Sequence, residues 1–274
     1  MADIELHRYV RAGIFGLMVV VCARLPVYAH EPLFGVGPHT LYQNGLGLET
    51  EFEVEDNGIS LHNEAIYGIT TDLAVTVVAP WVRQEEGDRT SSGLGDISLR
   101  TKWRFFRRDG PGMQDALALI FGAKLPTGDD QAAMPLGTGS ADLFGGIAAG
   151  RESRRWYYFG DLRYRVNTEA NGLKRGNVFF YDAAWGIRPV LARYEQPDLV
   201  LLVEANGKVA GKAQRDDILN PNTGGHVISI SPGFLFSVRN VMLKGGINLP
   251  VLWDLNGAQE DPETEILFGI EFHI

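Results

Sequence analysis

Apolar and polar side chains alternate with a period of two along most of the chain, and the clearest example lies between residues 97 and 105. The odd-numbered positions of that stretch are mostly apolar and include Leu99 and Trp103, whereas the even-numbered positions include Arg100, Lys102 and Arg104. A period of two places the two sets on opposite faces of a β-strand. The pattern therefore predicts a strand with one apolar face and one charged face.

The same hairpin rhythm recurs to the end of the chain and gives twelve predicted strands. A turn at residues 109–112 follows the first example, and short turns alternate with longer polar connections elsewhere. Long polar loops are predicted at residues 84–92, 128–139, 168–176, 212–225 and 253–263. An even strand number with such alternation is typical of bacterial outer-membrane barrels. We therefore predict an all-β fold, a transmembrane antiparallel up-and-down β-barrel of about 12 strands, over residues 39–274.

Residues 1–29 have the features of a secretory signal peptide, which we expect to be removed. Arg8 and Arg11 precede an apolar stretch at 12–23, and Ala29 ends a small-residue cleavage pattern. Twelve apolar residues are too few for a spanning helix, and the rest of the chain contains no run of 18. The alternative is a retained N-terminal helix that is buried or acts as an anchor.

The single cysteine, Cys22, lies within the predicted signal peptide. Val21 precedes it at a position where a lipid-attachment motif requires a small residue, so lipidation is disfavoured. The mature chain is consequently expected to have no disulfide, no thiolate metal site and no cysteine nucleophile.

Residues 30–38 are rich in proline and glycine and are predicted to form a periplasmic or luminal segment, with a partial plug as one possible role. Cleavage after Ala29 would leave His30 at the N-terminus, where an α-amine and an imidazole could bind copper together with His39. The simpler interpretation is that cleavage merely leaves a histidine first. We therefore predict no metal site and keep the copper hypothesis as an alternative.

The chain has 25 basic and 34 acidic residues, which gives no footprint for nucleic-acid binding. Charged residues on the inward faces of the predicted strands are expected to line the pore: Glu49, Glu51, Glu53, Arg100, Lys102, Arg104, Asp161, Arg163, Arg165, Glu204 and Glu271. Barrels of eight strands are filled by side chains, whereas those of sixteen enclose an aqueous channel. Twelve strands therefore predict a narrow, charged pore, and the alternative is a salt-bridged lumen that is closed.

The five tryptophans, Trp81, Trp103, Trp156, Trp185 and Trp253, all fall near predicted strand ends. That distribution is typical of the aromatic girdles of membrane barrels, and the alternative is a tryptophan-containing soluble core.

The sequence contains no nucleophile elbow, no zinc-protease motif and no phosphate-binding loop. His226 with Ser229 or Ser231 is a candidate catalytic pair, and nothing in the sequence orients it. We therefore predict no catalytic residues and no cofactor.

Three motifs resemble the outer-membrane channel family named for the meta-pathway of phenol degradation. They are the Gly-Leu-Gly-Asp strand start at 93–96, the Pro-Thr-Gly loop at 126–128 and the glycine-rich strand start at 137–142. The motifs cover about 50 residues, while the hairpin rhythm extends the resemblance over most of the mature chain. The resemblance implies a barrel for uptake or efflux of small, often apolar molecules, and it supplies no substrate and no catalytic residues.

Together these observations predict a monomeric channel in the outer membrane of a Gram-negative bacterium, passing small, aromatic or apolar molecules by passive diffusion. The expected partners are outer-membrane lipid and lipopolysaccharide, the barrel-assembly machinery that reads the apolar C-terminal strand, and the solute. The alternatives are a structural or interaction barrel with a closed lumen, a barrel enzyme, and a metal-linked protein that uses His30.

Overall fold

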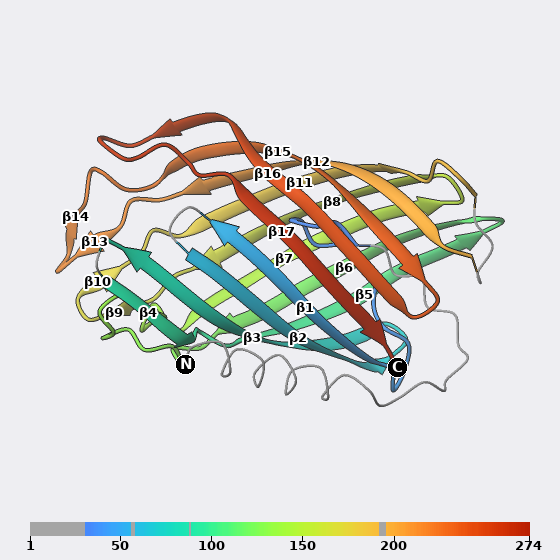
Figure 1. The fold of residues 1–274 in the computed structure, drawn as a ribbon, viewed down its shortest axis with the longest axis horizontal. Helices are drawn as coiled ribbons and strands as arrows, with labels where there is room; N and C mark the ends of the chain where they lie inside the picture. The colour runs from blue at the N-terminus through green and yellow to red at the C-terminus, as the bar shows by residue number, and fades with distance from the viewer. Residues whose placement is uncertain (1–30, 56–57, 88, 192–195) are drawn as a thin grey trace, which may run out of the picture.

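The computed structural model describes residues 31–55, 58–87, 89–191 and 196–274, and within them it contains strands and no helix. No helix in those ranges is long and apolar enough to cross a membrane. One sheet of 13 antiparallel strands closes on itself, because β2 (Gly58–Thr70), the first strand in its order, also pairs with β3 (Leu73–Glu86), the last but one. The last strand, β4 (Arg89–Leu94), pairs only with β3, so the other twelve form the barrel wall (Figure 1). The predicted fold class is confirmed.

The strands of the wall follow one another in chain order. They are β1 (Leu46–Glu55), β2 (Gly58–Thr70), β3 (Leu73–Glu86), β5 (Ser98–Gly110), β6 (Met113–Lys124), β7 (Asp142–Ser153), β8 (Trp156–Val166), β11 (Val178–Ile187), β12 (Asp198–Ala210), β15 (Gly225–Val238), β16 (Val241–Leu255) and β17 (Glu265–His273). Strand β17 pairs with β1, which brings the C-terminal strand beside the first one.

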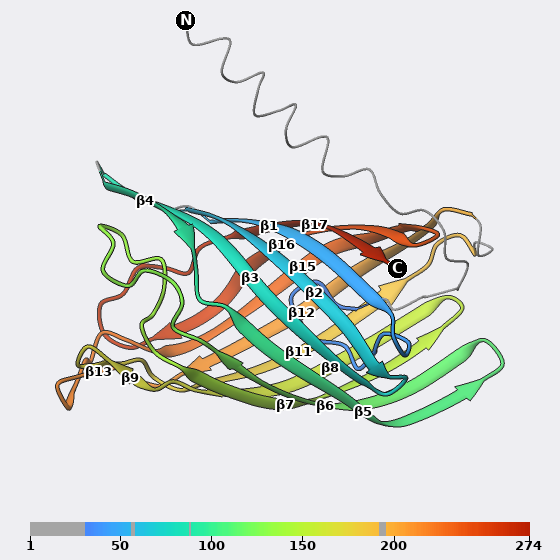
Figure 2. The same ribbon diagram turned by 90° about the horizontal axis from the view of Figure 1, so that it is seen from below.

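Short and long connections lie at opposite ends of the barrel. Two-residue turns join β2 to β3, β5 to β6, β7 to β8 and β15 to β16, and the C-terminus lies at the same end, which we call the short-turn end (Figure 1). Most of the longer connections lie at the other, the long-loop end (Figure 2). Two connections depart from this pattern: the longer one between β11 and β12 lies at the short-turn end, and the short one between β1 and β2 lies at the long-loop end. The turn after β5, predicted at residues 109–112, contains only residues 111–112, because β5 continues through the charged residues up to Gly110.

Several segments predicted as polar loops form strands, which corrects the sequence-based interpretation. Strand β3 extends to Glu86 and pairs with β4 (Arg89–Leu94), so residues 84–92 form a hairpin beyond the wall. A separate four-stranded sheet at the long-loop end consists of β9 (Glu169–Ala170), β10 (Leu173–Lys174), β13 (Gln214–Arg215) and β14 (Ile218–Leu219). The backbone N–H and C=O groups of these polar segments hydrogen-bond to neighbouring strands. Such pairing requires no apolar periodicity, so the sequence pattern did not reveal it.

The outer surface of the barrel is a belt of large apolar side chains. Leu99 and Leu162 are 44% and 49% exposed, and no second layer covers them within the described residues. Trp81 and Trp253 lie toward the long-loop end, whereas the other three tryptophans lie toward the short-turn end. So large an exposed apolar surface indicates contact with lipid, and the tryptophans occupy the positions expected of two girdles.

The barrel interior is partly apolar, which corrects the expectation that the inward faces are ionic throughout. Tyr157, Val200 and Leu235 are 1%, 0% and 0% exposed and form a cluster in which Leu33 from the N-terminal segment participates. Val200 belongs to an unbroken apolar run in β12, where alternation cannot reveal a second buried face. The core therefore lies inside the barrel, between the wall and the N-terminal segment.

Candidate functional site

Residues 31–42, which we call the luminal segment, lie inside the barrel and outside the sheet. The first predicted strand therefore begins at Leu46 rather than at His39. Leu33, Val36 and Leu41 are 6%, 6% and 4% exposed, so the segment is packed against the wall. The predicted roles of residues 30–38 remain predictions, since the position of the segment does not by itself establish that it blocks the lumen.

Two carboxylates of the wall hold the backbone of the luminal segment. Glu204 accepts N–H groups from Leu33 at 2.5 Å, Phe34 at 3.1 Å and Gly35 at 3.2 Å. Asp161 accepts the N–H group of Val36 at 2.8 Å. Successive N–H groups that converge on one anion form a favourable concave site for it. The buried carboxylates thereby gain hydrogen-bond donors, and the N–H groups of an irregular stretch of backbone gain acceptors.

The N-terminal side of the luminal segment is held by an ion pair between Glu31 and Lys102. Further along, His39 is buried, with its Nε2 atom 3.6 Å from Glu152 and its ring edge-on to Phe159. No group of three or more metal-binding side chains occurs in the described part of the chain. His30, the other residue of the copper hypothesis, lies outside it.

All eleven predicted pore-lining residues lie on the inward face of the wall, where each is buried or partly buried. The structure pairs most of them with partners that the sequence did not reveal: Arg100 with Glu64 (3.0 Å), Arg104 with Asp72 (2.9 Å), Glu53 with His62 (2.9 Å), Arg163 with Asp182 (2.5 Å), Glu271 with His273 (2.5 Å), and both Glu49 and Glu51 with Lys244. Arg163 also pairs with Asp161 at 2.5 Å. Whether these residues line an open path stays a prediction.

The missed partners come mainly from strands whose alternation is weak or whose inward charge is isolated. Glu64 and His62 belong to β2, in which apolar residues do not follow a clean period of two. Lys244 is the only charged residue of β16 before Asp254. His62 and Glu64 lie two positions apart, and Lys244 is in phase with the inward-facing residues of its strand. This spacing is the only sequence signal that could have identified them.

Two cavities flank the luminal segment. The first has a volume of about 200 Å³ and lies between the segment and the wall, with Glu49, Arg100 and Lys244 among its lining residues. The second has a volume of about 500 Å³ and is lined by residues such as Phe180 and Asn206. Phe34 and Arg163 line both cavities. They therefore mark the boundary between the two internal spaces.

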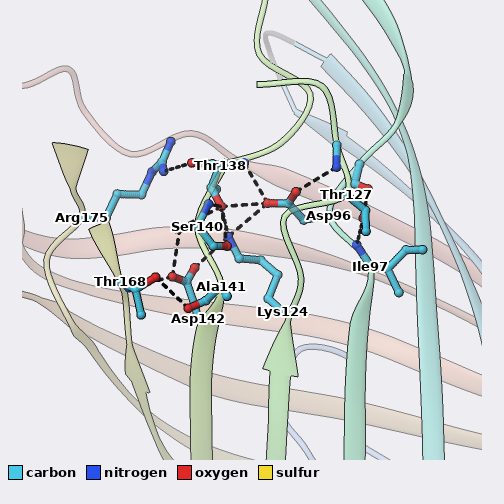
Figure 3. Close-up of polar contacts among 12 residues, drawn as sticks. Asp96, Ile97, Lys124, Thr127, Thr138, Ser140, Ala141, Asp142, Thr168 and Arg175 are labelled. Carbon is cyan, nitrogen blue, oxygen red and sulfur yellow. Dashed lines mark hydrogen bonds and ion pairs between the residues drawn. The ribbon is translucent and has the colours of Figure 1, made fainter. Parts of the chain in front are cut away.

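At the long-loop end, the three sequence motifs come together around Asp96 (Figure 3). Its carboxylate accepts the N–H group of Gly128 at 3.0 Å and both the N–H group and the hydroxyl of Thr138, at 2.7 Å and 2.8 Å. Lys124 bridges Asp96 at 3.1 Å and Asp142 at 2.7 Å. The motifs thus fix the long connection 125–141 to the ends of three wall strands.

Asp96 lies in the connection between β4 and β5, outside the wall strands. Burial alone would raise the pKa of its carboxyl group, but the hydrogen bonds from Thr138, Gly128 and Lys124 outweigh burial and lower the pKa below its ordinary value. The group is therefore charged at neutral pH, as its four donors require. The sequence marked these positions by resemblance, and only the fold revealed that they form one cluster.

The candidate catalytic pair is not assembled. Ser231 donates a hydrogen bond to Asn206 at 2.7 Å on the inward face, whereas His226 bonds Tyr181, a residue of the outward-facing set, at 2.6 Å. Ser229 and Ser231 lie three and five positions after His226, and such odd offsets in a regular strand direct side chains to opposite faces. The structure therefore provides no geometry for a serine nucleophile activated by His226.

A closed antiparallel barrel with an outward apolar belt and a charged, partly filled interior has the fold of an outer-membrane β-barrel. The chain belongs to the family described as "putative MetA-pathway of phenol degradation", whose profile matches residues 29–256. The resemblance inferred from the three motifs is thereby confirmed.

A solved structure agrees with this fold. An outer membrane channel from Pseudomonas putida F1 is 13% identical, with a TM-score of 0.68 over 90% of this chain and 100% of that one. LpxR from Salmonella typhimurium is 8% identical, with a TM-score of 0.48 over 82% and 99% of the two chains. No curated protein matches the sequence. At such identities the structural likeness concerns the fold alone.

Proposed function

We propose that the protein is an outer-membrane channel for passive diffusion of small solutes, including apolar or aromatic ones. The observation that supports this most directly is the pair of cavities inside a lipid-facing barrel, about 200 Å³ and 500 Å³, on the two sides of the luminal segment. A path through them would require only a local rearrangement near Phe34 and Arg163. Such transport depends on the size and charge of the constriction and needs no cofactor.

Family membership and the fold of the Pseudomonas putida channel support the same class of function. The charged wall also favours it, because ion pairs in a hydrated lumen cost less than in a dry core. A non-catalytic role, residence in a Gram-negative outer membrane, a monomeric state and the expected lipid and assembly partners all belong to this proposal.

A barrel with a closed lumen is the second candidate, and a specific observation favours it. Glu204 and Asp161 accept four N–H groups from the luminal segment, which would hold the segment in place as a permanent plug. In that case the working part of the molecule would be its long-loop end.

Single-channel recording separates the two candidates. The protein, folded into a planar lipid bilayer in potassium chloride, should give small discrete current steps, and a variant lacking residues 31–42 should give larger ones. Heat-modifiable mobility in gel electrophoresis would verify folding of both. A well-folded wild-type barrel without current, beside a conducting deletion variant, would overturn passive diffusion and support the closed-lumen alternative.

A further inference from the structure

Arg165 differs from Arg100, Arg163 and Lys244, three other inward-facing cations of the barrel wall. Within the described residues it forms no ion pair, and its Nε atom is buried without a hydrogen-bond partner. Arg100, Arg163 and Lys244, in contrast, each pair with a carboxylate. Among the described residues, Asp142 is the carboxylate that acts electrostatically on this guanidinium, but it makes no direct ion pair with it.

The surroundings of Arg165 are aromatic. Its guanidinium carbon lies 5.5 Å from the ring centroid of Phe180 on the neighbouring strand, and that of Arg163 lies 5.2 Å from the same centroid. A cation over an aromatic face gains some stabilisation, but it still lacks the bidentate oxygen partner that a guanidinium favours. An incoming planar oxyanion would provide that partner.

The larger cavity begins at the same ring. It is about 500 Å³ in volume, within the range of small-molecule sites, and Phe180, Phe34 and Val227 give it apolar walls. Asn206 and Ser229 supply polar groups along another side. Phe180 both lines this cavity and contacts Arg165, so a molecule with its anionic group at Arg165 could extend past that ring and place an apolar body in the cavity.

The acidic residues of this cavity restrict the charge of such a ligand. Asp182 lines it and is paired with Arg163, while Glu263 and Glu265 line the side formed by β17 and the loop before it. A second negative charge on the ligand would approach these carboxylates and be repelled. Arg163 and Lys208 also line the cavity, so its composition of two cations and three carboxylates favours a ligand with no more than one negative charge.

We propose that Arg165 and Phe180 form a binding site for a small organic monoanion, a monocarboxylate with an aromatic or otherwise apolar body, at the long-loop end of the lumen. This inference rests on the proposed channel function, which it deepens by naming a class of solute. Arg165 binds the carboxylate and Phe180 contacts the body, before the solute reaches the boundary at Phe34.

The test uses benzoate and its neutral analogue benzamide as probes. Proteoliposomes containing the full chain should take up benzoate in preference to benzamide. Arg165→Gln should reduce that preference about tenfold, the loss expected for a charge-assisted interaction. Arg165→Lys should retain part of it, and Phe180→Leu should weaken uptake of benzoate more than that of acetate. Arg83→Gln, which removes an exposed guanidinium of the outer hairpin, is the matched control and should change nothing.

Calorimetric titration of benzoate into the detergent-solubilised protein separates failure of the site from failure of the channel. Binding that Arg165→Gln abolishes, without uptake of either probe by the wild type, would overturn the channel and support the site. Uptake with the same benzoate-to-benzamide ratio in wild type and Arg165→Gln, together with equal calorimetric titrations, would overturn the site and leave the channel in place.

Discussion

The carboxylate of Glu204 accepts the backbone N–H group of Leu33 at 2.5 Å, although 171 positions separate the two residues along the chain. Glu204 is 1% exposed, so this contact lies in the interior of the barrel. The same carboxylate also binds the next two N–H groups. The position of the luminal segment consequently depends on one side chain more than on any other described contact.

Glu204→Gln should therefore loosen the luminal segment. The amide keeps one oxygen acceptor and introduces an N–H₂ group that faces backbone donors, which should weaken the attachment by about 2 kcal/mol. That energy corresponds to roughly thirtyfold in the ratio of attached to detached segment. Single-channel recording should detect it as more frequent or larger current steps. Glu260→Gln, in an exposed loop, serves as the control, and equal conductance of the Glu204 variant and the wild type would contradict the expectation.

The packing of Leu33 offers an independent way to displace the same segment. A Cβ atom added at Gly246 would lie 2.7 Å from the Leu33 Cδ1 atom, so Gly246→Ala should push that side chain from its position. The outward-facing Gly145 has no neighbour closer than 3.5 Å to an added Cβ atom. We expect protease to cleave residues 31–42 faster in Gly246→Ala than in Gly145→Ala. Restored protection in the double variant Leu33→Ala/Gly246→Ala would identify the steric contact as the cause.

Asp96 should control the order of the connection 125–141. Asp96→Asn removes the charge that four donors share, so proteolysis and amide hydrogen exchange of that connection should increase while the barrel stays folded. Asp217→Asn is a suitable control because Asp217 is exposed in another loop and asparagine tolerates its positive φ of 64°. Unchanged exchange in Asp96→Asn would show that the cluster does not hold the loop.

The lowered pKa of Asp96 gives this order a pH dependence with a definite sign. A carboxyl group whose folded-state pKa lies below its ordinary value of 3.8 stabilises the structure fully above that value. The contribution is lost as the pH falls through the folded-state pKa. Hydrogen exchange of residues 125–141, corrected for its intrinsic pH dependence, should therefore show protection that is constant near neutrality and declines below about pH 4. In Asp96→Asn that acid-dependent decline should be absent.

The lipid-facing belt predicts that a charged substitution on the outer face lowers the folding stability by an amount that depends on its depth in the membrane. Leu162 is 49% exposed near the middle of β8, so Leu162→Arg would place a cation among acyl chains. The expected loss is about 2–4 kcal/mol in the free energy of folding into lipid vesicles, measured by urea titration. Leu219→Arg, in β14 beyond the wall, should cost less than about 1 kcal/mol. Equal effects of the two substitutions would argue against the assigned membrane belt.

The alternation of side chains was sufficient to predict the barrel, its strand number and the inward orientation of residues such as Arg100 and Glu204. It failed where a polar segment forms a strand, as in β4, and where both faces of a strand are apolar, as around Val200. It also missed Lys244, a lone inward charge whose importance depends on two carboxylates from another strand. A period of two shows on which face of a strand a residue lies, but it does not show which residue lies opposite across the lumen.

The sequence by itself determined the hairpin rhythm, the lipid-facing belt and the motifs that identify the family, because strand geometry and membrane solvation act locally and leave a periodic pattern. The tertiary structure alone decided that Gly128, Thr138 and Lys124 converge on Asp96, and that the luminal segment packs under Glu204. Those contacts join residues far apart in the chain. They form only when neighbouring strands pair, as β5, β6 and β7 do around Asp96, and when the wall encloses the luminal segment.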